Sequence, residues 1–574
     1  MKQIFRISKT ELQVLFYSPI AWFVLVIFAF QCAGMYTGWI SQWGEVMQLG
    51  GRAYQMTETM FMGIFGMFPR IDRQLFYYIP LLTMGLVSRE LSSGSIKLLY
   101  SSPISNTQII MGKFMAMAIY GFIMVGILGL MYIHAAIVID NFDWAFPLVG
   151  LLGLFLSICV YGAIGIYMSS LTSYQMVAAL STFVVLTVLS QVAGWWQSID
   201  FVRDITYWLS IRGRSTTFLR GMLCSEDFLY FVVVTALFVV LTIFRLNSKR
   251  EKLSRVTTLS RYGILFVVVI GIGYMSSRPN LKMYWDATHF DRNTIPKGSL
   301  DVLNELKGQG KMTITTYNNI FDEERLSIMI GPEGEVFDMK SFEQYIRFKS
   351  DISMKYVYYY STKGFGYNAY KQRHKDKTDE EIIEILCKRM RLNPSRLLTE
   401  EQVLELEPGL ADEDFRLVKV VTMEDGRKGF IRYFNDMMAR PFDREITATF
   451  KRMILEKFPK VAFLSGTGRV ITQGGDMNYS NFTDKLNRTS LYNQGFDVTS
   501  VDLKTPIDAD VNIMVIADMN FTMTPEQKAN YQQFIDRGGN LFILGEPVNY
   551  QYTNAIVEQF GVKALAGRIV QGQD

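Results

Sequence analysis

The chain has 574 residues, enough for several domains, and a formal net charge of +4, too small to indicate a nucleic-acid-binding surface. Hydrophobic residues make up 49% of the chain, but nearly every long apolar run lies before residue 280. The four cysteines are scattered without the spacing of a metal site, and we expect neither a metal nor a cofactor. This distribution predicts a membrane-embedded half followed by a soluble half.

The membrane half begins with a basic segment of mixed polarity. Residues 1–18 combine Lys2, Arg6 and Lys9 with apolar residues at helical spacing, which predicts an amphipathic helix lying on membrane lipid. Residues 19–245 follow with about six apolar runs long enough to cross a bilayer, and residues 246–278 hold a basic linker and one more run. The expected spans are approximately 19–40, 72–88, 112–138, 146–169, 174–195, 227–245 and 262–278.

The distribution of charge between these runs predicts their orientation. Lysine and arginine favour the cytoplasmic side of short loops. The N-terminal segment, the loop with Arg89, Lys97 and Lys113, and the basic linker are therefore expected in the cytoplasm. The loop with Asp140 and Asp143 has no basic residue and is expected outside. An odd number of spans then places the soluble half outside the cytoplasm.

The chain shows no energy source of its own. His134 is the ionisable residue expected well inside a span, and a lone histidine there is better explained by a hydrogen bond than by ion-coupled transport. No G-x-x-x-x-G-K-[ST] phosphate loop occurs in the sequence. Leu91–Ser95 is superficially similar to the signature of ABC ATPases, but it lacks the surrounding ATPase domain. Any hydrolysing subunit must therefore be another chain.

A polar segment with glycine and proline, Arg89–Lys113, separates two of the apolar runs. A solvated loop is the simplest interpretation, but the spacing resembles the E-x-x-x-G-T-x-E-L-L-x-x-x-P-[VI] stretch of ABC-2 transporter permeases. Leu91, Ser95 and Lys97 depart from that pattern. The resemblance covers most of the first 260 residues, and it is carried by Glu90, Gly94, Ser95, Leu98, Leu99, Ser102, Pro103, Ile104, Gly112 and Lys113.

In that family the segment is a short cytoplasmic coupling helix that touches a separate ABC ATPase subunit. The resemblance implies the same contact here, and it implies a second permease half in a homodimer or heterodimer. It implies no catalytic residue in this chain. The residues expected to contact the ATPase are Arg89, Glu90, Gly94, Ser95, Leu98, Leu99 and Pro103.

Residues 279–455 have the mixed pattern of an α+β region. A short helix is expected at 299–306, and β-branched and aromatic residues predict strands at 312–317 and 356–360. Alternating apolar residues on both sides of Asp425 and Gly426 predict a hairpin.

Residues 456–574 have a more regular pattern of alternating strands and helices. This alternation predicts a mostly parallel, flavodoxin-like sheet with helices on both faces, an α/β fold. Strands are expected at 461–464, 498–503, 511–518 and 541–544, and helices at 481–493 and 524–537.

This soluble half resembles the periplasmic region of gliding-motility GldG proteins, the ABC-transporter auxiliary domain. The matching stretches are WDATHFDRNTIPKGSLDVLNEL, FLSGTG, Asp508–Asp518 and Phe534–Pro547. With the first half, the chain resembles a GldF–GldG-type fusion. The resemblance implies a multi-pass protein of the bacterial inner membrane with a periplasmic C-terminal half. Such proteins usually continue to a final span, so we expect the chain to continue beyond Asp574.

The carboxyl ends of the parallel strands are where a ligand of such a fold would bind. The residues expected at that edge are Ser465, Gly466, Gly468, Asp518 and Glu546. A glycine-rich turn alone is weak evidence for a ligand, and a structural turn is the simpler interpretation. No nucleophile with a base beside it is visible, so a binding or mechanical role is favoured over an enzyme.

Together these features predict a permease subunit that moves substrate by alternating access, driven by ATP hydrolysis in a partner. The alternative is an ABC machine that does not transport but transmits movement to a periplasmic envelope partner, as in gliding. A membrane-anchored periplasmic hydrolase is a third class, and it would require a deep pocket at the strand ends.

Overall fold

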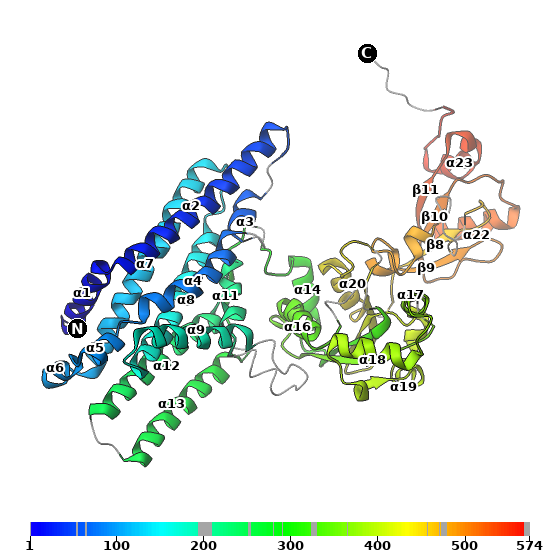
Figure 1. Ribbon diagram of the computed structural model, residues 1–574. Coiled ribbons are helices and arrows are strands. Elements are labelled where there is room, and N and C mark those ends of the chain that lie inside the picture. Colours follow the sequence, from blue (N-terminus) through cyan, green and yellow to red (C-terminus); the bar gives the residue numbers. More distant parts are fainter. Residues whose placement is uncertain are drawn as a thin grey trace. The chain divides into compact units, whose positions relative to one another are not determined.

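The computed structural model divides the chain into two compact units, Met1–Thr294 and Ile295–Asp574 (Figure 1). Each unit is described by itself. The structure describes residues 2–52, 55–62, 66–192, 209–250, 254–278, 281–289, 291–322, 330–363, 365–434, 436–455, 457–469, 471 and 479–567.

The first unit is a helical bundle with one small two-stranded sheet. Its strands, β1 and β2, pair antiparallel. The elements are α1 (Lys2–Tyr17), α2 (Pro19–Gln48), α3 (Met56–Phe61), α4 (Met67–Thr83), α5 (Ser88–Ser93), α6 (Ile96–Ser101), α7 (Asn106–Val138), α8 (Ala145–Leu171), α9 (Gln175–Gln191), α11 (Ile211–Leu219), β1 (Met222–Cys224), α12 (Ser225–Arg250), α13 (Arg255–Ser276) and β2 (Tyr284–Asp286).

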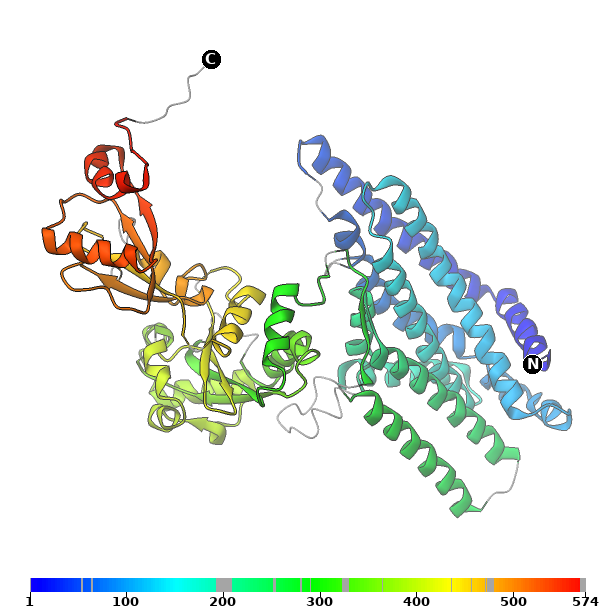
Figure 2. The ribbon, with the colours of Figure 1, turned by 180° about the vertical axis from the view of Figure 1, so that it is seen from behind.

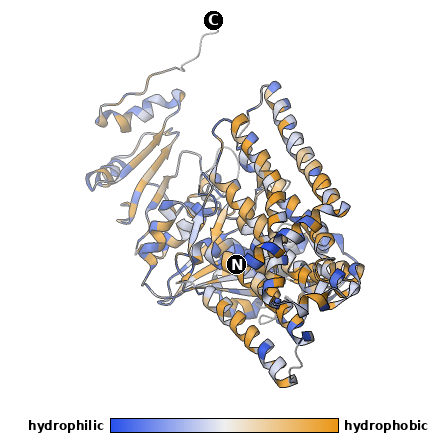
Figure 3. Cartoon of the chain, turned by 90° about the vertical axis from the view of Figure 1, so that its left-hand side faces the viewer, coloured by the Kyte–Doolittle hydropathy of each residue, from blue (hydrophilic) through white to orange (hydrophobic). Residues whose placement is uncertain are grey.

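Five of the described helices, α2, α7, α8, α12 and α13, are long and apolar enough to cross a membrane. Figure 3 shows the predominance of hydrophobic residues along the bundle helices. The other two expected spans correspond to α4 and α9, which have 17 residues each and fall short of the roughly 20 that cross a bilayer. In α4, Arg70, Asp72 and Arg73 interrupt the apolar sequence. The expected end of the fifth span, residues 193–195, lies outside the described residues.

Helix α8 is the centre of the bundle, because 83% of its apolar 18-residue stretch is buried. Glycines let its neighbours approach closely: a Cβ added at Gly165 would lie 2.0 Å from Thr83 Oγ1, and one at Gly150 would lie 2.3 Å from Phe68. Both neighbours belong to α4, which is thereby held against α8. Helix α13 is the least buried of the five long apolar helices, with 11% of its apolar 18-residue stretch buried. It lies beside α12 (Figure 2).

The second unit contains two sheets with helices packed around them. The elements are α14 (Lys297–Leu306), β3 (Met312–Asn319), η3 (Ile320–Asp322), α16 (Pro332–Ile346), β4 (Ile352–Tyr359), α17 (Phe365–Arg373), α18 (Asp379–Met390), η4 (Pro394–Arg396), β5 (Leu397–Leu398), α19 (Glu400–Leu406), η5 (Pro408–Glu413), β6 (Val418–Met423), β7 (Lys428–Arg432), α20 (Asp443–Arg452), β8 (Lys460–Leu464), α21 (Ser480–Thr483), η6 (Leu491–Gln494), β9 (Asp497–Val501), β10 (Val511–Ala517), α22 (Pro525–Asp536), β11 (Asn540–Leu544), η7 (Pro547–Asn549), α23 (Tyr550–Val557) and η8 (Glu558–Phe560).

The two sheets differ in strand direction. The first has the order β5-β4-β3-β6-β7 and is mixed, and its β6–β7 pair is the hairpin predicted around Asp425 and Gly426. The second has the order β11-β10-β8-β9, and all its neighbouring strands are parallel. The predicted α/β character with a mostly parallel sheet is therefore confirmed for the second sheet.

One predicted element of the second unit is wrong. In place of a helix over 481–493, the structure has two short pieces, α21 and η6, with a turn between them. Asp484 and Asn487 accept hydrogen bonds from backbone N–H groups two residues ahead. Such local bonds compete with helix formation, which explains why no continuous helix forms here.

Candidate functional site

The predicted ATPase-contacting segment forms two short helices joined by a sharp turn. We call Ser88–Ile104, which contains α5 and α6, the coupling segment. Gly94 joins the two helices with a φ of +73°, a left-handed conformation that favours glycine. Figure 1 shows α5 and α6 at the end of the bundle that carries α1, away from α3. The segment therefore protrudes at one end of the bundle.

One face of the coupling segment is open to solvent. Leu98 is 73% exposed, and Lys97, Ser101 and Pro103 are exposed beside it. Ile96 points the other way and is buried, so it anchors α6 to the bundle. Leu98 is therefore accessible to a docking partner, although a single exposed leucine is common on protein surfaces.

The opposite face of the coupling segment contacts a buried lysine. Lys113 of α7 is 1% exposed, and its Nζ lies 2.6 Å from Glu11 Oε1 of α1 and 2.6 Å from Glu90 Oε1 of α5. We call these three residues the lysine cluster. Arg89 adds a longer contact of 3.7 Å to Glu11. The cluster therefore joins α1, the coupling segment and α7 through charged side chains.

Electrostatics makes the three members of the lysine cluster depend on one another. Burial raises the pKa of Glu90 above its ordinary value, while the nearby ammonium of Lys113 acts in the opposite direction. Removing one charge of such a group leaves its partner buried and uncompensated, which is strongly unfavourable. The cluster thus holds the start of the coupling segment in a fixed position.

Further hydrogen bonds fix both ends of the coupling segment. At its start, the backbone N–H groups of Val87 and Ser88 donate to Ser169 Oγ of α8 at 3.1 and 2.9 Å. At its end, the Arg250 guanidinium of α12 donates to the carbonyls of Tyr100 and Ile104 at 2.9 and 3.2 Å. The segment is therefore fastened to α8 and α12 as well as to α1 and α7.

The seven predicted contact residues differ in their exposure, and one of them faces the interior of the bundle. Leu98 and Pro103 are exposed, Arg89 is partly exposed, and Gly94 forms the turn between the helices. Ser95 and Leu99 are half-buried beside them. Glu90 instead faces inward, with its side chain 14% exposed.

Sequence reasoning missed the importance of Lys113, Glu11 and Arg250. The available signal was a lysine near the start of an otherwise apolar run and a glutamate within an amphipathic helix. Burying such a charge is costly, and an oppositely charged partner offsets that cost. The partners here come from distant parts of the chain, so the sequence does not reveal them.

Comparison with known families agrees with this geometry. Residues 5–276 match the family described as ABC-2 family transporter protein. These residues, just under half of the chain, are similar to the membrane domain of this family, and we call them the ABC-2 domain. Residues 459–560 match a second family, described as ABC-type uncharacterized transport system, and we call them the auxiliary domain. The predicted resemblance to an ABC-2 permease followed by an ABC-transporter auxiliary domain is confirmed for residues 5–276 and 459–560. No curated protein matches the chain.

The auxiliary domain contains the second candidate site predicted from the sequence. Ser465 and Asp518 directly follow β8 and β10, so parallel pairing brings them to one edge of the sheet. Ser465 donates from its N–H and its hydroxyl to the Val501 carbonyl, at 2.8 and 3.1 Å. Arg469 donates from Nε to Asp518 Oδ2 at 2.5 Å. These interactions give Ser465 and Asp518 structural partners.

The other residues of that edge are turn residues or surface residues. Gly466 and Gly468 have φ values of +93° and +88°, which a tight turn requires. Glu546 is exposed, and its carbonyl accepts from the Asn549 N–H at 2.9 Å. Ligand binding by these residues stays a prediction.

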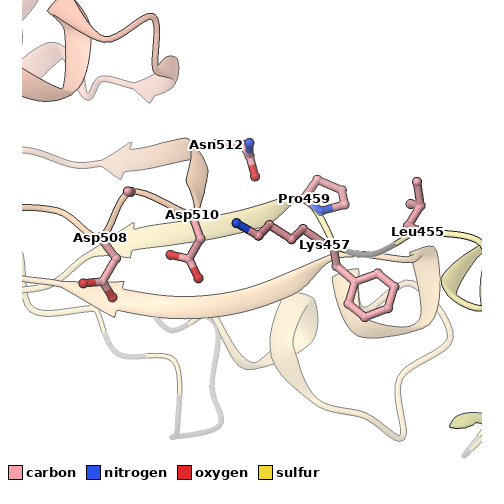
Figure 4. Close-up of a pocket in the computed structure, with 8 residues that line it drawn as sticks. Leu455, Lys457, Pro459, Asp508, Asp510 and Asn512 are labelled. Atoms are coloured by element: carbon pink, nitrogen blue, oxygen red, sulfur yellow. The ribbon is translucent and has the colours of Figure 1, made fainter. Parts of the chain in front are cut away.

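A cavity of about 660 Å³ lies at the opposite edge of the same sheet, where β8 and β10 begin. Figure 4 shows Lys457, Asp508 and Asp510 around it, with Pro459 behind. Asp510 forms an ion pair with Lys460 at 2.6 Å. The cavity is open and its charged groups are on the surface, so it is not the deep, acid-lined pocket that a hydrolase would require.

The ABC-2 domain also contains more buried charge than the sequence suggested. His134 does make the expected hydrogen bond, with 2.5 Å between its Nδ1 and the Tyr36 hydroxyl. Asp72, Glu226 and Asp227 are nevertheless buried as well, at the ends of α4 and α12. These three residues lie near helix ends rather than well inside a span, and packing of the helices buries them.

Proposed function

We propose that this chain is the membrane subunit of an ABC-type transporter in the bacterial inner membrane, powered by ATP hydrolysis in a separate subunit. The observation that carries the proposal is the coupling segment, which exposes an apolar side chain at its tip and is fastened to four helices behind it. A segment built in this way can receive force without yielding locally.

In this mechanism the exposed face docks into the ATPase and the buried face transmits its movement. Leu98 supplies apolar contact area, and Lys97 beside it suits an acidic surface. Glu90 acts as a positioning residue through Lys113. The apolar side chains exposed on α2 and α7 face lipid or the second permease half that a translocation path needs.

The experiment that tests this function is co-purification from native membranes with Leu98→Asp. We expect the unsubstituted chain to retain an ABC ATPase in mild detergent and the variant to lose it, because a carboxylate would be buried at the contact. Leu49→Asp is the matched control: Leu49 is 88% exposed at the far end of α2, and its substitution should leave the complex intact. The proposal would be overturned if both variants retained the ATPase, or if the unsubstituted chain retained none.

A second candidate function is mechanical output to an envelope partner without transport. It is favoured by the contacts of residues 281–289 and 291–294, which lead into the second unit and are fastened to the rest of the first unit. Truncation after Thr294 separates the two functions. Substrate export that survives truncation favours transport, whereas loss of an envelope partner with no exported substrate favours the machine.

A further inference from the structure

The segment between the last apolar helix and the second unit is attached to the ABC-2 domain along its length. We call residues 281–289 and 291–294 the strap. Its strand β2 pairs with β1, and the Ala287 N–H donates to the Gly221 carbonyl at 2.9 Å. The Ser225 N–H, at the start of α12, donates to the Met283 carbonyl at 3.0 Å. The strap therefore follows the outer end of α12.

Two more loops hold the second part of the strap. The His289 N–H donates to Asp143 Oδ2 at 2.9 Å, and Arg292 forms an ion pair with Glu58 of α3. Asn293 Nδ2 donates to the Arg220 carbonyl at 2.9 Å. Ile295, where the second unit starts, follows the strap directly. Any displacement of the strap is thus passed along the chain to that residue.

Beneath the strap lies a chain of charged contacts. Lys282 Nζ is 2.5 Å from Glu226 Oε2, and Arg214 Nη1 is 2.9 Å from Glu226 Oε1. Arg214 also reaches Asp227 at 2.8 Å. On the same helix, α11, the Ser215 hydroxyl donates to Asp72 Oδ2 of α4 at 3.2 Å. We call this set the outer relay: Asp72, Arg214, Ser215, Glu226, Asp227 and Lys282, all buried except the partly exposed Lys282.

The outer relay joins two helices that also meet at the coupling segment. Helix α4 holds Asp72, and its other end leads through a short turn into α5. Helix α12 holds Glu226 near its start and Arg250, which binds the coupling segment, at its end. At 1.5 Å per residue these two positions are about 36 Å apart. The two helices are therefore connected to each other at both ends.

We propose that α4 and α12 move together when the coupling segment moves. The outer relay joins the two helices and passes this movement to the strap, and so to the second unit. The physical reason is that buried ionic groups tolerate little separation. If α4 or α12 shifted alone, Asp72 or Glu226 would lose its partner in a desolvated site, which is costly, so the elements move together. This inference rests on the proposed role of the coupling segment as the input.

The test is hydrogen exchange of the strap amides, measured by mass spectrometry on the full chain in lipid nanodiscs. Arg250→Met releases two carbonyls of the coupling segment and lies at the far end of α12 from the strap. We expect it to accelerate exchange in the strap by about twofold to thirtyfold, the range found for coupling along such networks. A purely local role of Arg250 would leave the strap unchanged.

A second substitution locates the path. In a Glu226→Gln background, the additional acceleration caused by Arg250→Met should disappear, because the ion pair that links α12 to Lys282 of the strap is already removed. In the matched Glu58→Gln background, which breaks the strap's other ion pair, the acceleration should persist. If the Glu226→Gln variant does not fold, Lys282→Gln removes the same ion pair by changing its partly exposed member instead.

Unchanged strap exchange in the Arg250→Met variant, or equal acceleration in the Glu226→Gln and Glu58→Gln backgrounds, would overturn the proposal. No ATPase is present in this experiment. A failure of ATPase docking would therefore appear in the co-purification test alone, and the two failures are distinguishable.

Discussion

At the residue scale, Lys113 is the side chain on which the candidate site depends most. Its ammonium lies between two carboxylates from different helices and is almost fully buried. Sequence reasoning used this lysine as a topology signal and as part of the ABC-2 resemblance, and it placed Glu90 on the ATPase-contacting face. The packing of α1 against α7 gives both residues a different role, because it buries them together.

We expect Lys113→Met to destabilise the ABC-2 domain by about 3–5 kcal/mol, because Glu11 and Glu90 would remain buried without a counter-charge. Thermal unfolding in detergent would measure this change. Lys97→Met is the control, because Lys97 is exposed and a surface substitution should change stability by no more than about 0.5 kcal/mol. Equal melting temperatures for the two variants would contradict the assigned role of the lysine cluster.

At the element scale, the coupling segment is a helix–turn–helix whose shape depends on one glycine. A φ of +73° at Gly94 lets α6 turn away from α5 and present Leu98 to solvent. A Cβ added at this position would meet no atom within 4 Å, so the backbone conformation and not a lack of space favours glycine over alanine. The sequence pattern singled out this glycine, and the structure shows that it forms the turn between α5 and α6.

Gly94→Ala should therefore destabilise the protein by about 1–2 kcal/mol, through backbone strain alone. Gly126→Ala is a matched control, because Gly126 lies within α7 and also has open space around it, and alanine there should be neutral or stabilising. The measurement is the melting temperature of each variant in the same detergent. A Gly94→Ala variant as stable as Gly126→Ala would refute the strain argument.

At the scale of the whole molecule, the border between the units lies after the strap. The sequence predicts a border at residue 278, where the last apolar run ends, whereas the contacts of the strap assign residues up to Thr294 to the first unit. Hydropathy cannot detect this, because the strap is polar and its partners, β1, Asp143 and Glu58, are far away in sequence.

Truncation after Thr294 should accordingly give a more stable ABC-2 domain than truncation after Arg278. The shorter chain loses β2 and Lys282, which leaves β1 unpaired and Glu226 with one partner fewer, a loss of about 2 kcal/mol or more. Thermal unfolding and size-exclusion profiles of the two truncated proteins would measure this. Indistinguishable behaviour would show that the strap contributes nothing to the first unit.

The proposed topology also belongs to this scale. With Lys97→Cys and Glu305→Cys, each exposed on its own unit, an impermeant maleimide applied to intact spheroplasts should label only Glu305→Cys. Lys97→Cys should react after permeabilisation. The unsubstituted chain is the control, because its described cysteines are buried or half-buried. Labelling of both positions from one side would refute the orientation.

The sequence by itself determined the features that depend on local composition. Apolar length located long helices of the membrane half, and strand–helix alternation identified the parallel sheet around β8 and β10. The spacing from Glu90 to Pro103 singled out the coupling segment, whose contact with an ATPase stays a prediction. Each of these signals is periodic or contiguous along the chain, so it can be read without knowing which residues meet in space.

Only the tertiary structure decided which charges are buried together. Glu11 and Lys113, Asp72 and Ser215, and Glu226 and Lys282 are widely separated in sequence, and nothing in their local context distinguishes them from solvated residues. Helix packing removes water from these positions, and the same packing supplies the partner charges. The desolvation of an ionic group is a property of its surroundings in the folded protein, which is why the sequence could not reveal it.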